Sequence, residues 1–319
     1  MVVYAIRRIM QILPMLLVLT FLVFLGLEAM PGDAVSYMVG PDAIASMDPA
    51  QLEALRESLG LNDPLIVRYG RWLGGIATGN FGVSLTSGTQ VSEIIAVKLA
   101  ATLELSLAAL LISTFFGVIL GIVSALNRGS FLDNSLTVGG MLALSIPDFF
   151  FGLVLIVVFG LNLGWLPVGG RIGPADVHWW DHLDHLLLPA LALGLAMTAG
   201  VMRYSRSSML DVQSRAFMTT AKSKGMSNMR MNLVQGFRVA MTPVMVLIGF
   251  RLPTLISGSV VIEQIFQWPG IGSEFLRAVR GQDYPVIMAI ALLSTTAVLL
   301  ASLVVDLLTA AIDPRVRLS

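Results

Sequence analysis

The lysine at position 222 is the only one in the chain that is followed by a serine or a threonine, and it lies in the most basic segment. A phosphate-binding P-loop needs the pattern Gly-x4-Gly-Lys-Ser/Thr, in which backbone amides near the glycines surround the phosphates. Lys222 and Ser223 match the end of that pattern, but Ala216 and Ala221 occupy the two glycine positions. We therefore expect no ATP site and no enzyme activity in this chain, so any ATP that drives it must be bound elsewhere.

A second group with possible chemistry combines imidazole and carboxylate side chains within a short stretch. Such side chains, spaced three or four residues apart on a helix, can converge on a metal ion. Trp179 and Trp180 lie in the same stretch, and tryptophan pairs beside a span usually anchor it among the lipid headgroups. We favour this interfacial interpretation over a metal or pH-sensing site and assign no metal ligand. The group consists of His178, Asp181, His182, Asp184 and His185.

Three charged residues, Glu104, Asp148 and Arg251, lie nearest the depth of the membrane in the apolar segments. An unpaired charge at that depth costs about 2.5 to 3.5 kcal/mol on insertion scales. We therefore expect all three to face protein or water, either as structural ion pairs or as part of a polar translocation path. Asp306 lies close enough to the end of the last apolar segment to be interfacial.

A turn-rich segment between the last two apolar stretches, Glu263 to Gly272, is the other candidate for the path. Pro269, Gly270 and Gly272 predict a fixed turn. Such a loop either forms a rigid element at the mouth of a pore or only ties the last two spans together, and the sequence leaves both open. The candidate path or gate residues are Asp148, Arg251, Glu263, Trp268, Pro269 and Gly270.

The composition assigns these residues to a membrane protein. Of the 319 residues, 56% are hydrophobic and 13% are charged, against roughly 45 to 50% and about 25% in soluble domains. Six stretches reach or approach the roughly 20 apolar residues that a spanning helix needs. The predicted fold class is all-α, a polytopic membrane protein with about six transmembrane helices. The stretches run from Ile9 to Leu27, Leu105 to Leu126, Leu136 to Leu161, Leu186 to Met202, Met241 to Ile262 and Val286 to Ala311.

Two of the predicted spans are irregular. The third contains Pro147 and Asp148, which predicts a broken or partly interfacial helix. The fourth is the shortest and lies near the lower limit for spanning.

The placement of charge predicts the orientation. The formal net charge is zero, so we expect no basic surface for nucleic acid. Lysines and arginines gather between Arg203 and Arg238, and the positive-inside rule places that loop and both termini in the cytoplasm. No cleavage pattern follows the first apolar stretch, which we interpret as a retained helix. The absence of cysteine excludes disulfides and thiolate metal sites.

We divide the chain into a first transmembrane helix (1–28), an external segment (29–98) and a five-helix core (99–319) that contains the cytoplasmic loop 203–240. In the external segment, Asp48 before Pro49 predicts a helix start, and Gly60 predicts its left-handed stop. Asn62-Asp63-Pro64 predicts a second short helix, on which Tyr69 and Trp72 suit the membrane interface.

The basic loop resembles the "EAA" loop of ATP-binding-cassette (ABC) importer permeases, in the form found in the oligopeptide, dipeptide and nickel permease family. The match is Thr220-Ala221-Lys222-Ser223-Lys224-Gly225, with Pro243 following. Thr219 stands where the general motif has a glutamate. Other motifs of this family follow in the same order: Asn62-Asp63-Pro64-Leu65, Gly79-Asn80-Phe81-Gly82, Ser145-Ile146-Pro147, Glu263 to Gly272, Asp283-Tyr284-Pro285 and Asp313-Pro314-Arg315.

This resemblance implies the type I permease fold and one permease subunit of an ATP-driven importer in a bacterial inner membrane. The implied partners are a homologous second permease, two ATPase subunits that bind ATP and Mg, an external solute-binding protein and membrane lipid. The resemblance leaves the solute open among dipeptides, oligopeptides, nickel chelates and glycosides. It also implies that a helix of the basic loop docks into a groove on the ATPase, and we expect the spans to bury no part of this loop. The implied coupling residues are Arg215, Ala216, Phe217, Thr220, Ala221, Lys222, Lys224 and Gly225.

Two other classes of protein remain as alternatives. An ion-coupled secondary transporter predicts broken midplane helices in an inverted repeat, and a membrane-embedded enzyme needs metal ligands or a nucleophile and base within its spans. Neither alternative accounts for the basic loop, and we keep the secondary transporter as the second hypothesis.

Overall fold

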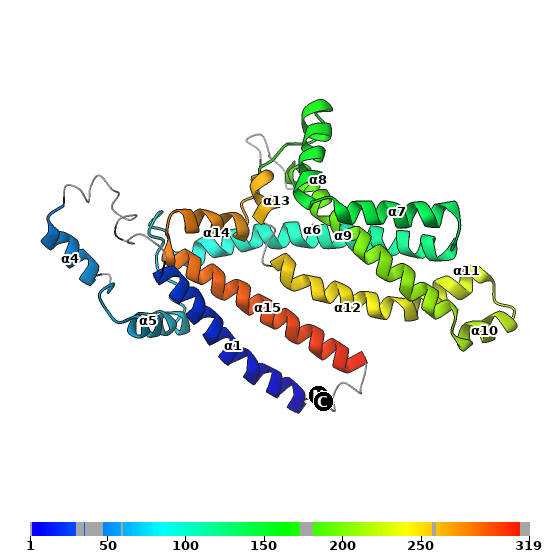
Figure 1. Ribbon diagram of the computed structural model, residues 1–319, viewed down its shortest axis with the longest axis horizontal. Coiled ribbons are helices and arrows are strands. Elements are labelled where there is room, and N and C mark those ends of the chain that lie inside the picture. The colour runs from blue at the N-terminus through cyan, green and yellow to red at the C-terminus, as the bar shows by residue number, and fades with distance from the viewer. Residues whose placement is uncertain are drawn as a thin grey trace.

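The computed structural model describes residues 2–29, 35, 47–58, 60–172, 181–256 and 260–312. In these ranges the chain consists of long helices joined by short ones (Figure 1). In chain order they are α1 (Val2–Glu28), α4 (Pro49–Ser58), α5 (Leu65–Ala77), α6 (Val91–Leu126), α7 (Phe131–Ser145), α8 (Asp148–Leu155), the π-helix η1 (Ile156–Asn162), α9 (Asp181–Gln213), α10 (Ala216–Ser223), α11 (Asn228–Arg230), the π-helix η2 (Met231–Gly236), α12 (Phe237–Ile256), α13 (Val260–Ile265), α14 (Ile271–Arg280) and α15 (Tyr284–Ile312).

The described part of the chain contains five helices that are long and apolar enough to cross a membrane. There are six if α7 is counted as one broken span with α8 and η1, which pass the same test together but bend by 100° at a short break. The all-α fold with about six spans is therefore confirmed. The five unbroken spans are Met10–Glu28, Val91–Leu126, His182–Gln213, Asn228–Arg251 and Tyr284–Leu307.

The break in the third span lies where the sequence predicts it. A residue before proline is pushed out of the helical region, and Ile146 accordingly has φ −88° and ψ 126°. Pro147 is also extended, with φ −61° and ψ 138°, and α8 starts at Asp148. The dipeptide Ile146-Pro147 thus turns one apolar segment into two helices.

Two predicted boundaries differ from the structure. The fourth span is not the shortest, because α9 runs through 33 residues and includes Pro189; counting apolar residues stopped at Met202, although the polar residues after it continue the helix. The fifth span does not continue to Ile262, because α12 ends at Ile256 and α13 is a separate short helix. In addition, α6 begins at Val91, inside the predicted external segment 29–98.

The largest helix contact joins α6 and α9, and glycines let the two backbones approach each other. A Cβ atom at Gly117 would lie 2.5 Å from the Cβ of Val201, and one at Gly121 would lie 2.5 Å from the Cβ of Ser205. On α9, a Cβ at Gly194 would lie 2.9 Å from the carbonyl oxygen of Ala109 on α6. Membrane helices use small residues in this way because close packing, not water exclusion, holds them together.

A buried carboxylate fixes one end of this helix pair. Asp133 of α7 is 2% exposed and accepts hydrogen bonds from Nε and Nη2 of Arg206 on α9, at 2.7 and 2.8 Å. It also accepts bonds from Ser124 Oγ of α6 at 2.5 Å and from the amide of Gly129 at 2.9 Å. Removing one partner of such a buried pair is strongly destabilising, so these contacts hold α6, α7 and α9 in one arrangement.

The first short helix of the predicted external segment begins and ends as predicted, whereas the second, α5, starts at Leu65 without a side-chain cap from Asp63. Asp48 Oδ1 accepts the amide of Ala50 at 3.1 Å at the start of α4, and Gly60 has φ +67°. Tyr69 of α5 is directed to α1, because its hydroxyl lies 2.8 Å from Thr20 Oγ1. The helix α5 therefore contacts α1 through this side chain.

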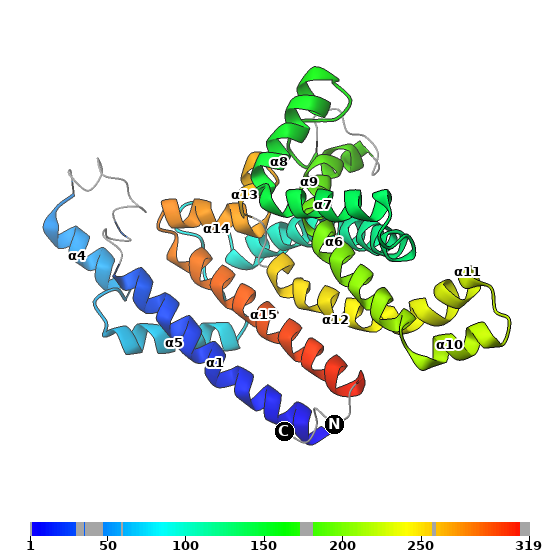
Figure 2. The same ribbon diagram turned by 45° about the vertical axis from the view of Figure 1, so that its right-hand side comes forward.

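The start of α1, the end of α15 and the basic loop lie toward one side of the molecule. Arg8 of α1 pairs with Asp306 of α15 at 3.2 Å, which places the start of α1 beside the end of α15. The ends of α6 and α9 and the start of α12 point toward the same side, where α10 projects, while α4, α5 and α14 lie at the opposite side (Figures 1 and 2).

The close approach of α6 and α9 predicts that Gly121→Ala is destabilising. The added methyl group would meet Ser205 and the carbonyl oxygen of Met202, and overpacking of this kind typically costs about 1 to 3 kcal/mol. The thermal midpoint of the purified protein in detergent should fall. Gly139→Ala on α7 is the matched control, because no heavy atom lies within 4 Å of its added Cβ. Equal midpoints for the two variants would contradict the proposed packing.

Candidate functional site

The basic loop carries a short helix, α10, that projects beyond the ends of α9 and α12 (Figures 1 and 2). The helix follows Arg215, which is extended at φ −77° and ψ 147°. It ends at Gly225, which has φ +78°, and the amide of Met226 returns to the carbonyl of Ala221 at 3.2 Å. The predicted left-handed stop at Gly225 is confirmed.

Most of the predicted coupling residues present their side chains to the outside. Arg215, Ala216, Phe217, Thr220, Lys222, Lys224 and Gly225 are exposed. Ala221 is half-buried and packs against an apolar cluster instead. Arg215 pairs with Asp211 at 2.7 Å on the surface, where such pairs contribute little to stability. The exposed face of α10 thus combines an aromatic ring with two lysines.

The expectation that the spans bury no part of this loop is wrong, and within α10 it fails at Met218. Met218 is 2% exposed and belongs to a cluster with Met209 and Val212 of α9, Met231 of η2 and Ala240 of α12. Helical spacing explains the error, since one face of α10 must be covered wherever the loop folds back onto the helix ends. The many methionines in and around this loop are the feature of the sequence that could have indicated this burial.

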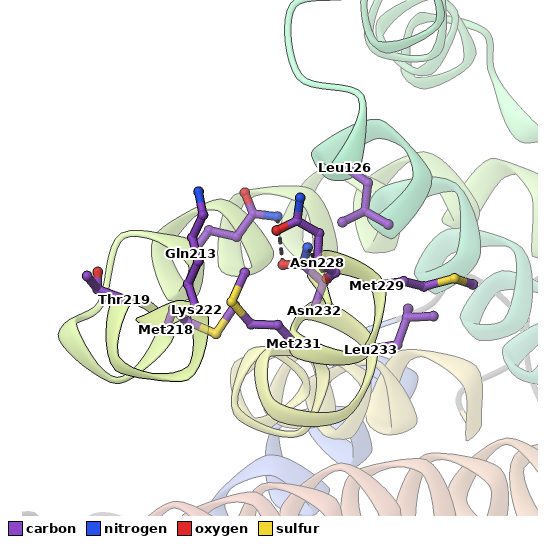
Figure 3. A pocket seen from close by; sticks show the side chains of 10 residues that line it. All are labelled: Leu126, Gln213, Met218, Thr219, Lys222, Asn228, Met229, Met231, Asn232 and Leu233. Carbon is purple, nitrogen blue, oxygen red and sulfur yellow. Dashed lines mark hydrogen bonds between the residues drawn. The ribbon is translucent and has the colours of Figure 1, made fainter. Parts of the chain in front are cut away.

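A hollow of about 750 Å³ opens beside α10. One wall is formed by Thr219 and Lys222 of α10 and the other by η2 and the end of α6, as Figure 3 shows. Gln213 donates to Asn232 at 3.2 Å between these walls. The hollow therefore lies beside the exposed helix and is lined by polar side chains and methionines. Its lining residues are Leu126, Gln213, Met218, Thr219, Lys222, Asn228, Met229, Met231, Asn232 and Leu233.

At the other side of the molecule, Glu263 is the centre of a buried network. Its side chain is 0% exposed and accepts hydrogen bonds from Thr102 Oγ1 of α6 at 2.9 Å and from the amide of Ser273 at 2.7 Å. Thr102 Oγ1 in turn accepts the amide of Ile271 at 2.7 Å. Burial raises the pKa of Glu263, and the donors of Ser273 and Thr102 oppose this shift. The network joins α13 and α14 to α6.

The turn after Glu263 is built around this carboxylate. Trp268 is fully buried and donates through Nε1 to the carbonyl of Ala101 at 2.8 Å. Pro269 follows, and a Cβ at Gly270 would overlap the carboxylate of Glu263. The turn is thereby fastened to α6, while Glu263, Trp268 and Pro269 also border a hollow of about 390 Å³. Their role as a gate or path stays a prediction.

The three charges expected at membrane depth have different surroundings. Glu104 pairs with Arg171 at 2.7 Å and lies 2.9 Å from His182 Nε2. Arg251 of α12 is half-buried and donates to the carbonyl of Met197 on α9 at 3.1 Å. Asp148 is exposed at the start of α8. The place of Asp148 and Arg251 in a path stays a prediction.

The histidine group is partly described. His182 contacts Glu104, and His185 Nδ1 lies 3.0 Å from the carbonyl of Gly169. Among the described residues, no three histidine or acidic side chains are grouped as metal ligands. His178, Trp179 and Trp180 lie outside the described residues, as do Asp313-Pro314-Arg315.

Two motifs far apart in the sequence meet at Asp283. This residue is 1% exposed and accepts hydrogen bonds from Ser84 Oγ at 2.5 Å and Thr86 Oγ1 at 2.8 Å. It thereby ties the loop after Gly79-Asn80-Phe81-Gly82 to the start of α15. Sequence reasoning noted both motifs but had no way to pair them.

Comparison with known proteins covers nearly the whole chain. Residues 117–318 match the family model "Binding-protein-dependent transport system inner membrane component", and residues 1–106 match the model of the N-terminal part of such membrane components. The oligopeptide transport system permease protein AppB of Bacillus subtilis (strain 168) is 40% identical over 319 residues, which cover 99% of this chain and 100% of that protein.

Two further relatives have similar coverage. A putative peptide permease of Brucella suis biovar 1 (strain 1330) is 40% identical over 318 residues, 99% of each chain. The glutathione transport system permease protein GsiC of Salmonella paratyphi A (strain ATCC 9150 / SARB42) is 37% identical over 314 residues, 98% of each chain.

The buried carboxylate of Glu263 predicts a specific interaction with Gly270. Gly270→Ala would displace the carboxylate from its donors, and a buried group left without partners costs about 1 to 3 kcal/mol. The thermal midpoint in detergent should therefore fall.

The control is a double-mutant cycle with Glu263→Ala, which removes the group that the new methyl would meet. In that background Gly270→Ala should cost much less, because contacting residues are not additive. If Gly270→Ala lowers the midpoint equally in both backgrounds, the carboxylate is not what requires the glycine.

Proposed function

The chain belongs to the family of binding-protein-dependent transport system inner membrane components, the ABC importer permeases, and we propose that the solutes it carries are peptides or similar small molecules. As a permease subunit it contributes helices to the translocation path. The relatives named for oligopeptide and glutathione transport support the peptide class. Nothing in the comparisons favours the ion-coupled secondary transporter.

The observation that carries the mechanism is the exposed helix α10. It projects from the ends of two spans, presents Phe217, Lys222 and Lys224, and has a defined end at Gly225. An amphipathic helix of this kind is suited to lie in a groove of another protein. We propose that α10 is the coupling helix and that the groove belongs to an ATPase subunit, which binds ATP and Mg.

The apolar surface of the broken span supports a second membrane partner. Met141 and Leu142 of α7 are 60% and 62% exposed, and Phe150 of α8 is 53% exposed. The bend also brings polar backbone near Pro147 to membrane depth, where it must be covered by protein or water. A homologous second permease would cover this surface, and the complete importer would contain two permeases, two ATPases and an external solute-binding protein.

In the proposed cycle, ATP binding draws the two ATPases and their docked coupling helices together. The spans connected to α10 then move as packed units, which opens the path toward the binding protein. After hydrolysis the ATPases separate and the path faces inward. The permease supplies no chemistry; its affinity for each ATPase state sets the direction of the shift.

The orientation follows from the same arrangement. The start of α1, the end of α15 and α10 lie toward one side of the molecule (Figure 1), and the basic residues of the loop assign that side to the cytoplasm. The helices α4, α5 and α14 are then external.

Single cysteines test this orientation in a chain that has none of its own. Glu57 of α4 and Ser223 of α10 are replaced one at a time; Ser223 is exposed, as is Glu57. A membrane-impermeant thiol reagent should label Glu57→Cys in intact cells and should label Ser223→Cys only after permeabilisation. The reverse pattern would overturn the topology.

Gly225→Val tests the proposed docking of α10. No heavy atom lies within 4 Å of a Cβ at this position, so the cost comes from the left-handed backbone alone, about 1 to 2 kcal/mol. Such a cost corresponds to roughly a five- to thirtyfold loss in a docking equilibrium. Uptake of radiolabelled trialanine by the reconstituted importer should fall accordingly, with normal membrane levels of the permease.

Gly225→Asn is the matched control, because asparagine adopts the left-handed conformation more readily than valine. It should retain most of the uptake and most of the peptide-stimulated ATP hydrolysis. Wild-type uptake by Gly225→Val would show that the helix stop does not contribute to coupling.

The purified permease alone should hydrolyse no ATP, and hydrolysis that survives removal of contaminants would contradict its assignment as a transport subunit.

A further inference from the structure

The helix α10 is attached to the rest of the chain through one buried side chain. Met218 is the only buried residue of α10, and Ala221 is the only other one that is not fully exposed. At both ends the backbone turns sharply, at Arg215 and at Gly225. A movement of α10 therefore reaches the spans through these turns or through Met218 and the adjoining, half-buried Ala221.

The side chain of Met218 lies in a socket formed by residues of four helices, among them Ala125 of α6. Met209 and Val212 come from α9, Met231 comes from η2 and Ala240 comes from α12. Figure 3 shows the side chains of Met218 and Met231 side by side between α10 and η2. Each wall of the socket thus belongs to a span, or to the π-helix that leads into one.

Gly236 makes room for two of these methionines. A Cβ atom at this position would lie 3.2 Å from Cε of Met209 and 3.3 Å from Cε of Met218. The two thioether methyl groups therefore meet above a residue that has no side chain. Since distances below about 3.4 Å force neighbours to shift, even an alanine here would tighten the socket.

The composition of the socket suits a joint that moves. Methionine is unbranched, has three rotatable bonds and adapts to irregular spaces. Gly236 ends η2, and π-helical segments are frequent at functional sites. A socket walled by branched residues would hold one arrangement, whereas thioether side chains can repack while they stay in contact.

We infer that Met218 is a positioning residue that transmits the movement of α10 to α9 and α12 through this socket. The inference rests on the proposed function, because it assumes that an ATPase moves α10. A residue with only a structural role would change stability and assembly, and its effect on transport would follow these two quantities. Replacing a transmitting residue lowers the amount of solute carried for each ATP hydrolysed, while the complex stays assembled.

The experiment uses the complete importer in proteoliposomes, with radiolabelled trialanine as the probe. Three quantities are measured: the yield of ATPase that co-purifies with the permease, the rate of ATP hydrolysis, and the ratio of peptide transported to ATP hydrolysed. Uptake by the wild-type importer is measured first. Its absence would contradict the proposed function and is distinguishable from any result on Met218.

Met218→Ala should leave the ATPase yield within about twofold of the wild type and lower the transport ratio at least fivefold. Met218→Leu fills the socket with a side chain of similar volume and should restore most of the ratio. Met10→Ala on α1 is the matched control, because it makes the same truncation at a methionine that is 70% exposed. A wild-type ratio in Met218→Ala, or a fall in its ratio that only follows a fall in yield, would overturn the inference.

Gly236→Ala tests the same joint without replacing a residue of α10 and applies even where Met218→Ala fails to assemble. The added methyl group tightens the socket around Met209 and Met218, so the transport ratio should fall while the ATPase yield is unchanged. A wild-type ratio in this variant would show that the room above Gly236 is not needed for coupling, and the socket would then not be the joint.

Discussion

The close approach of α6 and α9 is the constraint on which the other helices depend. Gly117, Gly121 and Gly194 remove the side chains that would separate the two backbones, and α7 and α8 both pack against α9. At about 1.5 Å per residue, the 36 residues of α6 span about 54 Å. On this helix, Thr102 contacts Glu263 and the amide of Ile271, and Ala125 belongs to the apolar cluster beside α10, so α6 joins the two regions.

Three buried carboxylates set the ends of this framework. Asp133 joins α6, α7 and α9 at the end nearer to α10, while Glu263 and Asp283 fasten the turns at the opposite end to α6 and α15. Each accepts hydrogen bonds from donors on other parts of the chain, and charge-assisted bonds of this kind are stronger than neutral ones. The long helices can therefore move as packed units, because their ends are fixed by directional contacts rather than by apolar packing alone.

The sequence predicted what depends on local rules. Apolar length gave the number of spans, Pro147 gave the break in the third, and glycine gave the left-handed stops at Gly60 and Gly225. It failed where tertiary contacts decide: the polar continuation of α9, the pairing of Asp283 with Ser84, and the burial of Met218. Such pairings depend on which helix faces meet, which neither spacing nor composition specifies. The coupling residues came from a motif, and that motif marked the exposed face of α10 and the half-buried Ala221 but missed Met218.

The bend at Pro147 has a consequence for the life of the chain before it is assembled. The backbone carbonyls just before the bend have no helical partners, and lipid offers no hydrogen bonds to replace them. A newly made subunit that reaches the bilayer alone therefore holds a costly, open segment, flanked by exposed side chains such as Phe149 and Phe150. The penalty is removed only when protein or water covers the bend, so one proline makes the stable insertion of the chain depend on that cover.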